Sequence, residues 1–535
     1  MGALGLLLIG LVCFAIAYKF YGDYLDHKVM GINSDAQTPA HAMYDGNEYV
    51  PAPAPVLLGH HFASIAGAGP ITGPIAAAAF GWLPVALWVI GGSIFFGGVH
   101  DYSALLASSR HEGKSIGEII KRNVGDRAQI LFLLFSWLTL LLVVAVFTIL
   151  TRDVFVAIPE VATTSILFIF LAIIFGLAIY RWKMPLGITT AAGIALLILC
   201  MYIGFNNPIV ADATTWTYFL LAYIFVASVA PVWILLQPRD YLNSFLLYAL
   251  LIGGLLGIIV GRPTFELPAF TSFDANGYLF PMLFVTVACG AISGFHSLVS
   301  SGTTAKQLDN EKDARFIGYG GMLIEGLLAL IALSTAAVLT SEGYATTLAE
   351  MGGPTGLFSH GIGIFLSYLG IPMSFGVVFG GLALNAFCLT SLDTATRLAR
   401  YAFQEFFEDR VPALTNKYIA TGVGLVLAGA LALSGNWSAI WPIFGSANQL
   451  LAGLALLSVS VWLMRRGRNY RPTFYPMVFM LIVTLTALAF LIRNNLAAQN
   501  YVLGVPGVLL FVLAIFLVIE TYNVMKDASK SDVKA

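Results

Sequence analysis

Long apolar runs, separated by short polar segments, repeat along almost the whole chain. A helix needs about 20 predominantly apolar residues to cross the hydrocarbon core of a bilayer. On that criterion we expect an all-α polytopic membrane protein with about 15 transmembrane helices. The predicted spans are residues 3–21, 54–79, 82–107, 128–150, 163–180, 185–205, 215–236, 241–261, 279–301, 316–340, 372–400, 416–434, 438–464, 473–493 and 503–525.

The basic residues between these spans predict an orientation, because Lys and Arg gather in cytoplasmic loops. If the N-terminus lies outside, all but three of the 27 basic residues fall on or beside cytoplasmic segments. The three exceptions are Arg152, Arg262 and Arg493. We therefore expect a multi-pass protein of a bacterial-type inner (plasma) membrane, with its N-terminus outside and its C-terminal tail in the cytoplasm.

Composition supports a membrane protein and narrows its functions. Only 10% of the 535 residues are charged and 59% are hydrophobic, whereas soluble domains have about 25% charged residues. No basic patch suggests a nucleic-acid partner, and the four cysteines show no metal-binding spacing. No GxSxG, HExxH or phosphate loop is present, so a membrane-embedded enzyme or sensor is a remote alternative. The expected partners are a small-molecule substrate and the lipid bilayer, with no cofactor and no metal.

The second predicted span contains an unusual stretch, GHHFASIAGAGPITGP at residues 59–74. Pro70 and Pro74 lack backbone donors and the glycines relax the backbone, so we expect no continuous helix here. Unwound backbone survives in a membrane only where protein or a cavity surrounds it. Discontinuous helices near the membrane centre are typical of secondary transporters.

A second interruption is predicted in the seventh span, at Pro231 in ASVAPVW, residues 227–233. Five-helix units of opposite topology, each beginning with a broken helix, form the LeuT-like 5+5 inverted-repeat plan. On this plan residues 1–52 form an N-terminal transmembrane helix and a cytoplasmic linker. Residues 53–405 form the inverted-repeat transport core, and residues 406–535 add C-terminal helices and a short cytoplasmic tail.

Ionisable residues inside spans are costly and usually functional. On the predicted topology a set of them shares one depth in the inner half of the membrane. Three interpretations of this layer remain open: a proton relay, a metal site, or a structural gate in which these groups pair with backbone or with Arg239 and Arg397. The candidate coupling or gating residues are His60, His61, His100, Asp101, His296 and Asp393.

The end of the ninth span carries several hydroxyl side chains, which are suitable ligands for Na⁺. A cation site between this helix and the broken second span is one interpretation, and helix packing through Ser and Thr is the other. The candidate residues are Ser297, Ser300, Ser301, Thr303 and Thr304. Asn448 and Gln449 in the thirteenth span are expected either to face the substrate path or to tie helices together.

Three segments outside the spans have distinct patterns. Residues 23–51 are polar and acidic, and the PAPAP run at 51–55 should be extended. Residues 110–125 predict a short amphipathic helix with Ile116, Ile119 and Ile120 on one face. Residues 341–363 contain no Lys or Arg and several glycines, and read either as a surface loop or as a cap over an outer vestibule.

These motifs resemble one known family. The stretch PVLLGHHFASIAGAGPITGP looks like the signature of the carbon starvation protein A family. Further segments match it too: GGVHDY at 97–102, ISGFHS at 292–297, SSGTTAKQ at 300–307, SLDTATR at 391–397 and FGSANQLLA at 444–452. The resemblance implies uptake of peptides or of pyruvate during carbon starvation, with proton coupling proposed. In architecture the chain is similar to the amino acid–polyamine–cation superfamily.

The resemblance and the breaks together predict a carrier that works by alternating access. A free helix N-terminus stabilises a carboxylate, and both pyruvate and peptides carry one. H⁺ is the expected coupling ion, with Na⁺ as the alternative and a channel as a more distant rival. The candidate substrate-binding residues are Gly67, Gly69, Thr72, Gly73 and Trp233.

Overall fold

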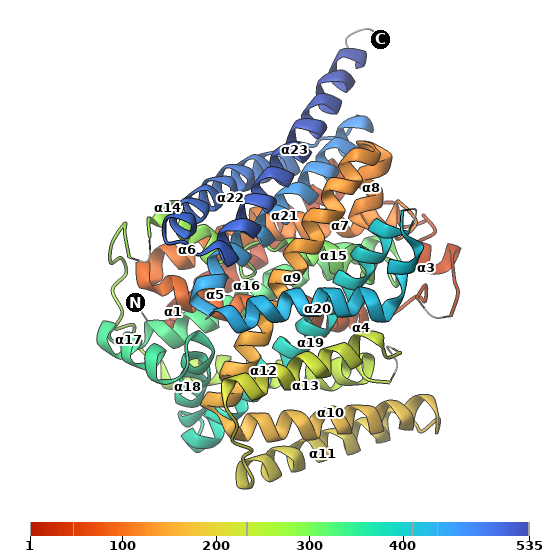
Figure 1. Cartoon of the computed structure of the whole chain (residues 1–535). Coiled ribbons are helices and arrows are strands. Elements are labelled where there is room, and N and C mark those ends of the chain that lie inside the picture. The colour runs from red at the N-terminus through yellow and green to blue at the C-terminus, as the bar shows by residue number, and fades with distance from the viewer. Residues whose placement is uncertain are drawn as a thin grey trace.

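The computed structural model describes residues 2–46, 48–231, 234–275, 277–408, 410–435 and 437–532, and these residues form an all-helical protein (Figure 1). No β-strand occurs within those ranges beyond isolated bridges. Among the described residues, twelve helical segments are long and apolar enough to cross a membrane. They are Ala3–Met30 (α1, Ala3–Ile16, and α2, Gly22–Tyr24, with π-helical turns), Trp82–Ser109 (α6, Trp82–Gly92, and α7, Gly98–Ser109), Asp126–Ala157 (α9), Pro159–Tyr180 (α10), Leu186–Asn206 (α11), Leu236–Gly261 (α13), Glu311–Ala337 (including α16, Gly320–Ala337), Met373–Phe407 (α19), Lys417–Ser434 (α20), Trp437–Arg465 (α21), Arg471–Ala497 (α22) and Tyr501–Val524 (in α23, which runs to Asp532).

The predicted count of about 15 spans is not confirmed. A bent pair of helices, α4 (Ala54–Ile65) and α5 (Gly69–Ala77, continued to Phe80), raises the count from twelve to at most thirteen. The seventh predicted span is the 17-residue helix α12 (Ala213–Val229). The ninth is divided into two short helices, α14 (Leu279–Thr286) and α15 (Gly294–Gly302). Apolar length alone does not distinguish a continuous helix from a divided one.

The second span is broken, as predicted, but the break is shorter than the sequence suggested. Helix α4 ends at Ile65, α5 begins at Gly69, and the two are bent by 48°. Pro70 lies in the first turn of α5, where a missing N–H costs nothing because that group has no partner within the helix. The unwound segment is therefore residues 66–68, and the GPITGP run predicted to be non-helical lies in α5.

The second discontinuity lies in the ninth span and not in the seventh. Pro231 falls between α12 and α13, outside any helix, and Trp233 lies outside the described residues. The chain unwinds instead between Thr286 and Gly294. Helix α4 contacts α15 and α5 contacts α14, so the two broken helices lie side by side and run antiparallel.

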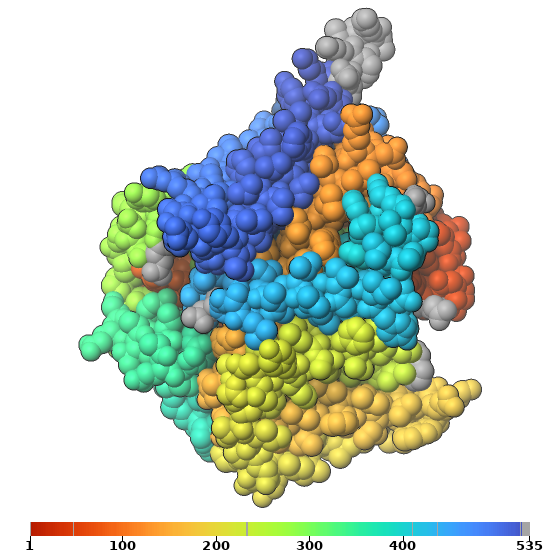
Figure 2. Space-filling model, in the orientation of Figure 1, coloured from red at the N-terminus to blue at the C-terminus, as the bar shows by residue number. Residues whose placement is uncertain are grey.

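The centre of the bundle is built from α9, α19 and α21. Helices α9 and α19 pack along each other, and α21 is buried along almost its whole length. By contrast, α10 and α11 form a separate pair at the lower edge of the molecule (Figures 1 and 2). Large apolar side chains of α11, including Ile188, Ile198 and Tyr202, are exposed there. Such a surface suits contact with lipid.

The segments outside the long helices are more ordered than the sequence indicated. The first helix continues to Met30, eight residues into the polar segment predicted at 23–51, and α3 (Pro39–Ala42) follows it. Helix α8 (Ile116–Asn123) forms as predicted, with Ser115 accepting a hydrogen bond from the Glu118 N–H. Its three isoleucines are buried against the protein, mainly on α9.

Residues 341–363 form most of two helices, so the interpretation as a plain surface loop is wrong. They are α17 (Ser341–Glu350) and α18 (Pro354–Ser367), and most of α18 is buried. The hydroxyl of Tyr344 donates to the carbonyl of Ile75, so α17 covers the C-terminal end of α5. The apolar, glycine-rich character of α18 is explained by its packing on α13, α16 and α19.

Candidate functional site

Three of the predicted coupling residues form a hydrogen-bonded chain in the interior. Asp101 on α7 lies between two imidazoles: its Oδ1 is 2.7 Å from Nδ1 of His100, and its Oδ2 is 2.8 Å from Nδ1 of His296 on α15. All three side chains are buried. Because a carboxylate only accepts, each Nδ1 carries the proton that it donates to Asp101. This chain ties α7 to the second broken helix.

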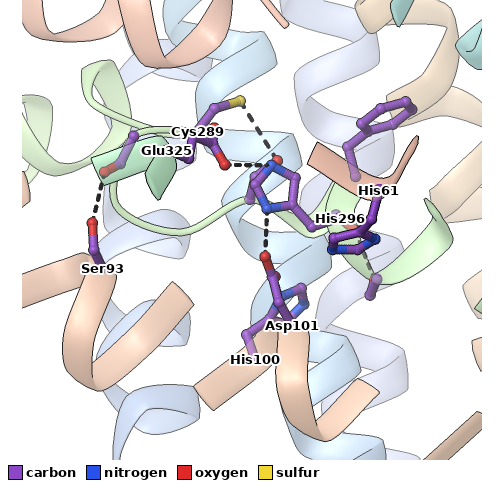
Figure 3. Close-up of polar contacts among 12 residues, drawn as sticks. His61, Ser93, His100, Asp101, Cys289, His296 and Glu325 are labelled. Atoms are coloured by element: carbon purple, nitrogen blue, oxygen red, sulfur yellow. Dashed lines mark hydrogen bonds and ion pairs between the residues drawn. The ribbon is translucent and has the colours of Figure 1, made fainter. Parts of the chain in front are cut away.

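A fourth member of this cluster, Glu325 on α16, was missed by the sequence analysis. Its Oε2 lies 3.4 Å from Nε2 of His296, and the side chain is completely buried. In Figure 3 the His296 ring lies between the carboxyl groups of Asp101 and Glu325. As the sole charged residue of the predicted span 316–340, Glu325 carried the same signal as the others. We call His100, Asp101, His296 and Glu325 the His296 cluster.

His61 connects the first broken helix to this region. Its Nδ1 is 2.9 Å from Oγ1 of Thr304, just beyond α15, and its ring lies against Gly321 of α16. Helix α4, which ends at Ile65, also contacts α15, the helix that carries His296. Four elements therefore converge here: α4, α7, α15 and α16.

Asp393 belongs to a different cluster, so the predicted single layer is divided in two. Its Oδ2 is 2.5 Å from Nη1 of Arg239, and it also accepts from the hydroxyl of Tyr223, 2.9 Å away. Asp240 lies 3.6 Å from the same guanidinium and accepts from Thr390. His60 lies on this side, where it interacts with Asp240. We call Tyr223, Arg239, Asp240, Thr390 and Asp393 the Arg239 cluster.

The division has a geometric cause. His60 and His61 are neighbours in α4, so their side chains leave the helix about 100° apart and face different partners. His61 points towards α16 and Thr304, whereas His60 lies near α13. Asp393 pairs with Arg239, one of the two arginines named in the structural-gate interpretation. Arg397, the other suggested partner, donates to the carbonyls of Ala227 and Ala230 instead.

The hydroxyls of the predicted cation site mostly bond within their own segment. Ser297, Ser301 and Thr303 donate to carbonyls of the preceding turn. Thr304 bonds His61, and Ser300 Oγ is buried without a hydrogen-bond partner among the described residues. The three backbone bonds are those expected of Ser and Thr in helix packing. No group of three or more His, Cys, Asp or Glu residues in the described ranges has the geometry to hold a metal ion.

Polar side chains of α21 stabilise the break in the ninth span. Asn448 accepts from the Phe295 N–H at 2.9 Å, and Gln449 donates to the carbonyl of Phe284 at 2.7 Å. Trp88 and Trp441 donate to the carbonyls of Val287 and Thr286, each at 3.1 Å. Free backbone groups in a membrane must find such partners. Asn448 and Gln449 therefore make the contacts expected of residues that tie helices together.

Replacing Asn448 by alanine should destabilise the protein by about 1–3 kcal/mol, because the buried Phe295 N–H loses its acceptor. Thermal unfolding of the purified protein in detergent measures the effect. Asn494→Ala, at an exposed position near the end of α22, is the matched control and should change stability by less than about 0.5 kcal/mol. Equal stability of the two variants would contradict this role for Asn448.

The predicted substrate residues have different surroundings. A Cβ on Gly67 would lie 2.4 Å from Oγ of Ser391 and 3.3 Å from the ring of Phe147, so α19 and α9 closely approach the first break. Oγ of Ser391 and Oγ1 of Thr72 are buried and have no hydrogen-bond partner within the described chain.

Gly69 and Gly73 face the second broken helix. A Cβ on Gly69 would lie 2.3 Å from Sγ of Cys289, and a Cβ on Gly73 would lie 2.7 Å from the carbonyl oxygen of Thr286. These two glycines let α5 pack against the unwound segment. The sequence pattern predicted them instead as substrate-binding residues. Gly67, by contrast, lies in the first break itself.

Comparison with known proteins identifies the family of this chain. The family model described as carbon starvation protein CstA matches residues 2–351 and 345–487. The peptide transporter CstA of Escherichia coli (strain K12) is 35% identical, over 91% of this chain and 81% of its own. The pyruvate/proton symporter BtsT of the same organism is 33% identical over the same shares.

The peptide transporter CstA of Bacillus subtilis (strain 168) is 31% identical over 97% of this chain and 96% of its own. A manganese transporter from Eremococcus coleocola has a TM-score of 0.49 at 12% identity, covering 90% of this chain and 99% of that chain. The relatives are named as transporters, and the described part of the chain holds twelve candidate spans, so the protein is a multi-pass membrane transporter and not an enzyme. It belongs to the carbon starvation protein CstA family.

Proposed function

We propose that the protein is a proton-coupled importer of a small carboxylate-bearing nutrient, either pyruvate or short peptides, and that it works by alternating access. The observation that carries this proposal is the His296 cluster, a buried chain of titratable side chains placed where two broken helices cross. Imidazole exchanges protons near neutral pH, and buried ionisable side chains inside a membrane mark proton pathways. The names of the relatives, a peptide transporter and a pyruvate/proton symporter, support the same class.

An inverted repeat is part of the proposal, with its second unit starting at the ninth span and not at the seventh. The broken helix α4–α5 is followed by a span with a π-helical turn, then by α8, then by the 32-residue helix α9. The broken helix α14–α15 is followed by a span with a π-helical turn, then by α17 and α18, then by the 35-residue helix α19. The antiparallel contact of the two broken helices supports opposite topologies of the two units.

The two clusters suit alternating access because they join elements that must separate. The His296 cluster links α7, α15 and α16, and His61 links α4 to the end of α15. The Arg239 cluster joins α13 to α19 beside α4. With the N-terminus outside, both lie in the inner half of the membrane. Breaking the contacts of α4 would open the inner side, whereas α17 over the end of α5 covers the outer side.

The substrate is proposed to bind at the first break, next to Gly67. Ser391 and Thr72 each present a buried hydroxyl without a partner in the described ranges, and Phe147 provides an apolar wall. Two hydroxyl donors and the start of α5 suit a carboxylate. An aromatic wall suits the carbon chain behind it. This chemistry suits pyruvate and a peptide C-terminus equally, and the transport assay below distinguishes between them.

The test is transport by the purified protein in liposomes, with labelled pyruvate and labelled dialanine compared in parallel. We expect an inside-alkaline pH gradient to drive accumulation of one of them, and a protonophore to abolish it. Exchange of labelled for unlabelled substrate without a gradient is expected as well, because a carrier reorients with substrate bound. Protein-free liposomes are the control.

Two outcomes would contradict the proposal. Accumulation driven by a Na⁺ gradient and indifferent to pH would support the sodium-coupled alternative. High conductance with no counterflow exchange would identify a channel, since a pore does not couple the movement of one substrate molecule to that of another.

A further inference from the structure

Glu325 is the least satisfied ionisable group in the interior. Its side chain is completely buried on α16, and neither carboxyl oxygen has a hydrogen-bond partner among the described residues. Its helix neighbours Met322, Leu328 and Ala329 are buried and apolar. An ionised carboxylate in such a place costs several kcal/mol unless it is paired and hydrogen-bonded. The negative charge of an ionised Glu325 would therefore need a compensating group.

The groups that face Glu325 cannot balance its charge, which leaves protonation of Glu325 itself as the way to neutralise it. They are His296 on α15, Asp101 on α7 and Cys289 in the unwound segment. Asp101 carries a negative charge that repels a second one, and Cys289 is a neutral thiol. His296 is already engaged by Asp101 at 2.8 Å and lies 3.4 Å from Glu325. One imidazolium balances one carboxylate, so the buried cluster is electrically neutral when Glu325 holds a proton.

We propose that Glu325 is the residue that binds the coupling proton, and that His296, Asp101 and His100 position it. This inference rests on the proposed proton-coupled function and names the residue of that site that titrates. In the conformation described here, where Glu325 is completely buried, it is the neutral acid. When the inner side opens, water reaches the carboxyl, its O–H bond breaks, and the proton passes to water. The carboxylate left behind faces the His296 imidazolium.

This arrangement couples proton movement to reorientation for an electrostatic reason. With Glu325 ionised, the cluster holds two carboxylates and one imidazolium, and it cannot close without burying a net charge. With Glu325 protonated, closure buries no net charge. Protonation therefore favours closure and reorientation with substrate, and after the proton leaves on the inner side the empty, deprotonated carrier returns more slowly and completes the cycle.

The test compares the wild-type protein with Glu325→Gln in liposomes, with labelled pyruvate and dialanine as probes. Glutamine has the size of the acid and its amide oxygen can still accept a hydrogen bond from the His296 Nε2–H, but it cannot exchange a proton. A gradient of one pH unit can drive about tenfold accumulation at one proton per substrate, since 1.4 kcal/mol corresponds to a factor of ten. We expect wild-type protein to approach that ratio and Glu325→Gln to remain near equality, while its counterflow exchange stays within about twofold of wild type.

The controls separate the possible failures. Glu350→Gln removes an exposed carboxylate from α17 and should accumulate substrate as wild type does. If wild-type protein accumulates neither probe, the proposed function is wrong and the role of Glu325 falls with it. If wild type accumulates a probe and Glu325→Gln does so equally, only the role of Glu325 is wrong. Loss of both exchange and accumulation in a folded Glu325→Gln protein would indicate a structural role and overturn the inference.

Glu325→Asp tests the proposal independently if the glutamine variant does not fold. The shorter side chain keeps a titratable carboxyl but withdraws it from His296. We expect accumulation to persist, with the pH of half-maximal accumulation displaced from that of wild type. An unchanged pH profile would mean that this carboxyl does not carry the coupling proton.

Discussion

Replacing Arg239 by glutamine is expected to cost about 3–5 kcal/mol of stability, the penalty for removing one partner of a buried ion pair. Its guanidinium is buried and lies 2.5 Å from Asp393 and 3.6 Å from Asp240. Without it, two carboxylates remain in the interior with no counter-charge. Because proteins are stable by about 5–15 kcal/mol, such a loss is a large fraction of the whole. The half-life of the purified protein against thermal inactivation in detergent measures it.

A double variant provides the internal control for this prediction. Arg239→Gln combined with Asp393→Asn removes both members of the shortest ion pair and leaves Asp240 as the single buried carboxylate of the cluster. We expect it to be more stable than Arg239→Gln alone, because one uncompensated charge is gone. If the double variant were no more stable than the single one, the charge balance would not be the source of the effect.

Asp101→Asn is expected to reduce proton-driven uptake by at least about tenfold. Asp101 accepts from both imidazoles, at 2.7 and 2.8 Å, and hydrogen bonds to a charged group contribute about 1.5–3 kcal/mol each. The amide oxygen of asparagine carries no charge, and its NH₂ group cannot accept from a second imidazole. The link from α7 to α15 is then weakened, and His296 loses the group that orients it towards Glu325. Initial rates of labelled uptake under an imposed pH gradient measure the change.

His100→Gln is the matched variant for Asp101→Asn. It removes one of the two hydrogen bonds to Asp101 and leaves the bond between Asp101 and His296 in place. We therefore expect a smaller loss of uptake than for Asp101→Asn. Equal losses of uptake in the two variants would mean that losing the His100–Asp101 hydrogen bond alone is as damaging as losing the Asp101 carboxylate. That result would contradict the central position of Asp101.

Several features were predictable because they depend on local chemistry. The break near Gly67 follows from glycine and proline in an apolar span, and the short helix α8 follows from its Ser115 cap and its isoleucines. The prediction that His100, Asp101 and His296 are functional residues rests on the cost of ionisable groups in a membrane. Each of these inferences needs only a residue and its neighbours in sequence.

The features that sequence reasoning misplaced depend on contacts between distant segments. The ninth span looks continuous because its unwound residues 287–293 are mostly apolar and small, and contain no proline. The chain unwinds there because Asn448, Gln449, Trp88 and Trp441, from two other helices, satisfy the freed backbone groups. Pro231 gave a stronger local signal but lies between helices.

By itself the sequence determined that this is an all-helical membrane protein, that its second span is broken, and that a few ionisable residues lie within its spans. These follow from hydropathy, backbone chemistry and the cost of burying charge, which act at each position separately. Only the tertiary structure decided which charges meet. It divided one predicted layer into the His296 and Arg239 clusters, placed the second break in the ninth span, and brought Glu325 to His296. Such pairings depend on helix rotation and crossing, which no single segment specifies.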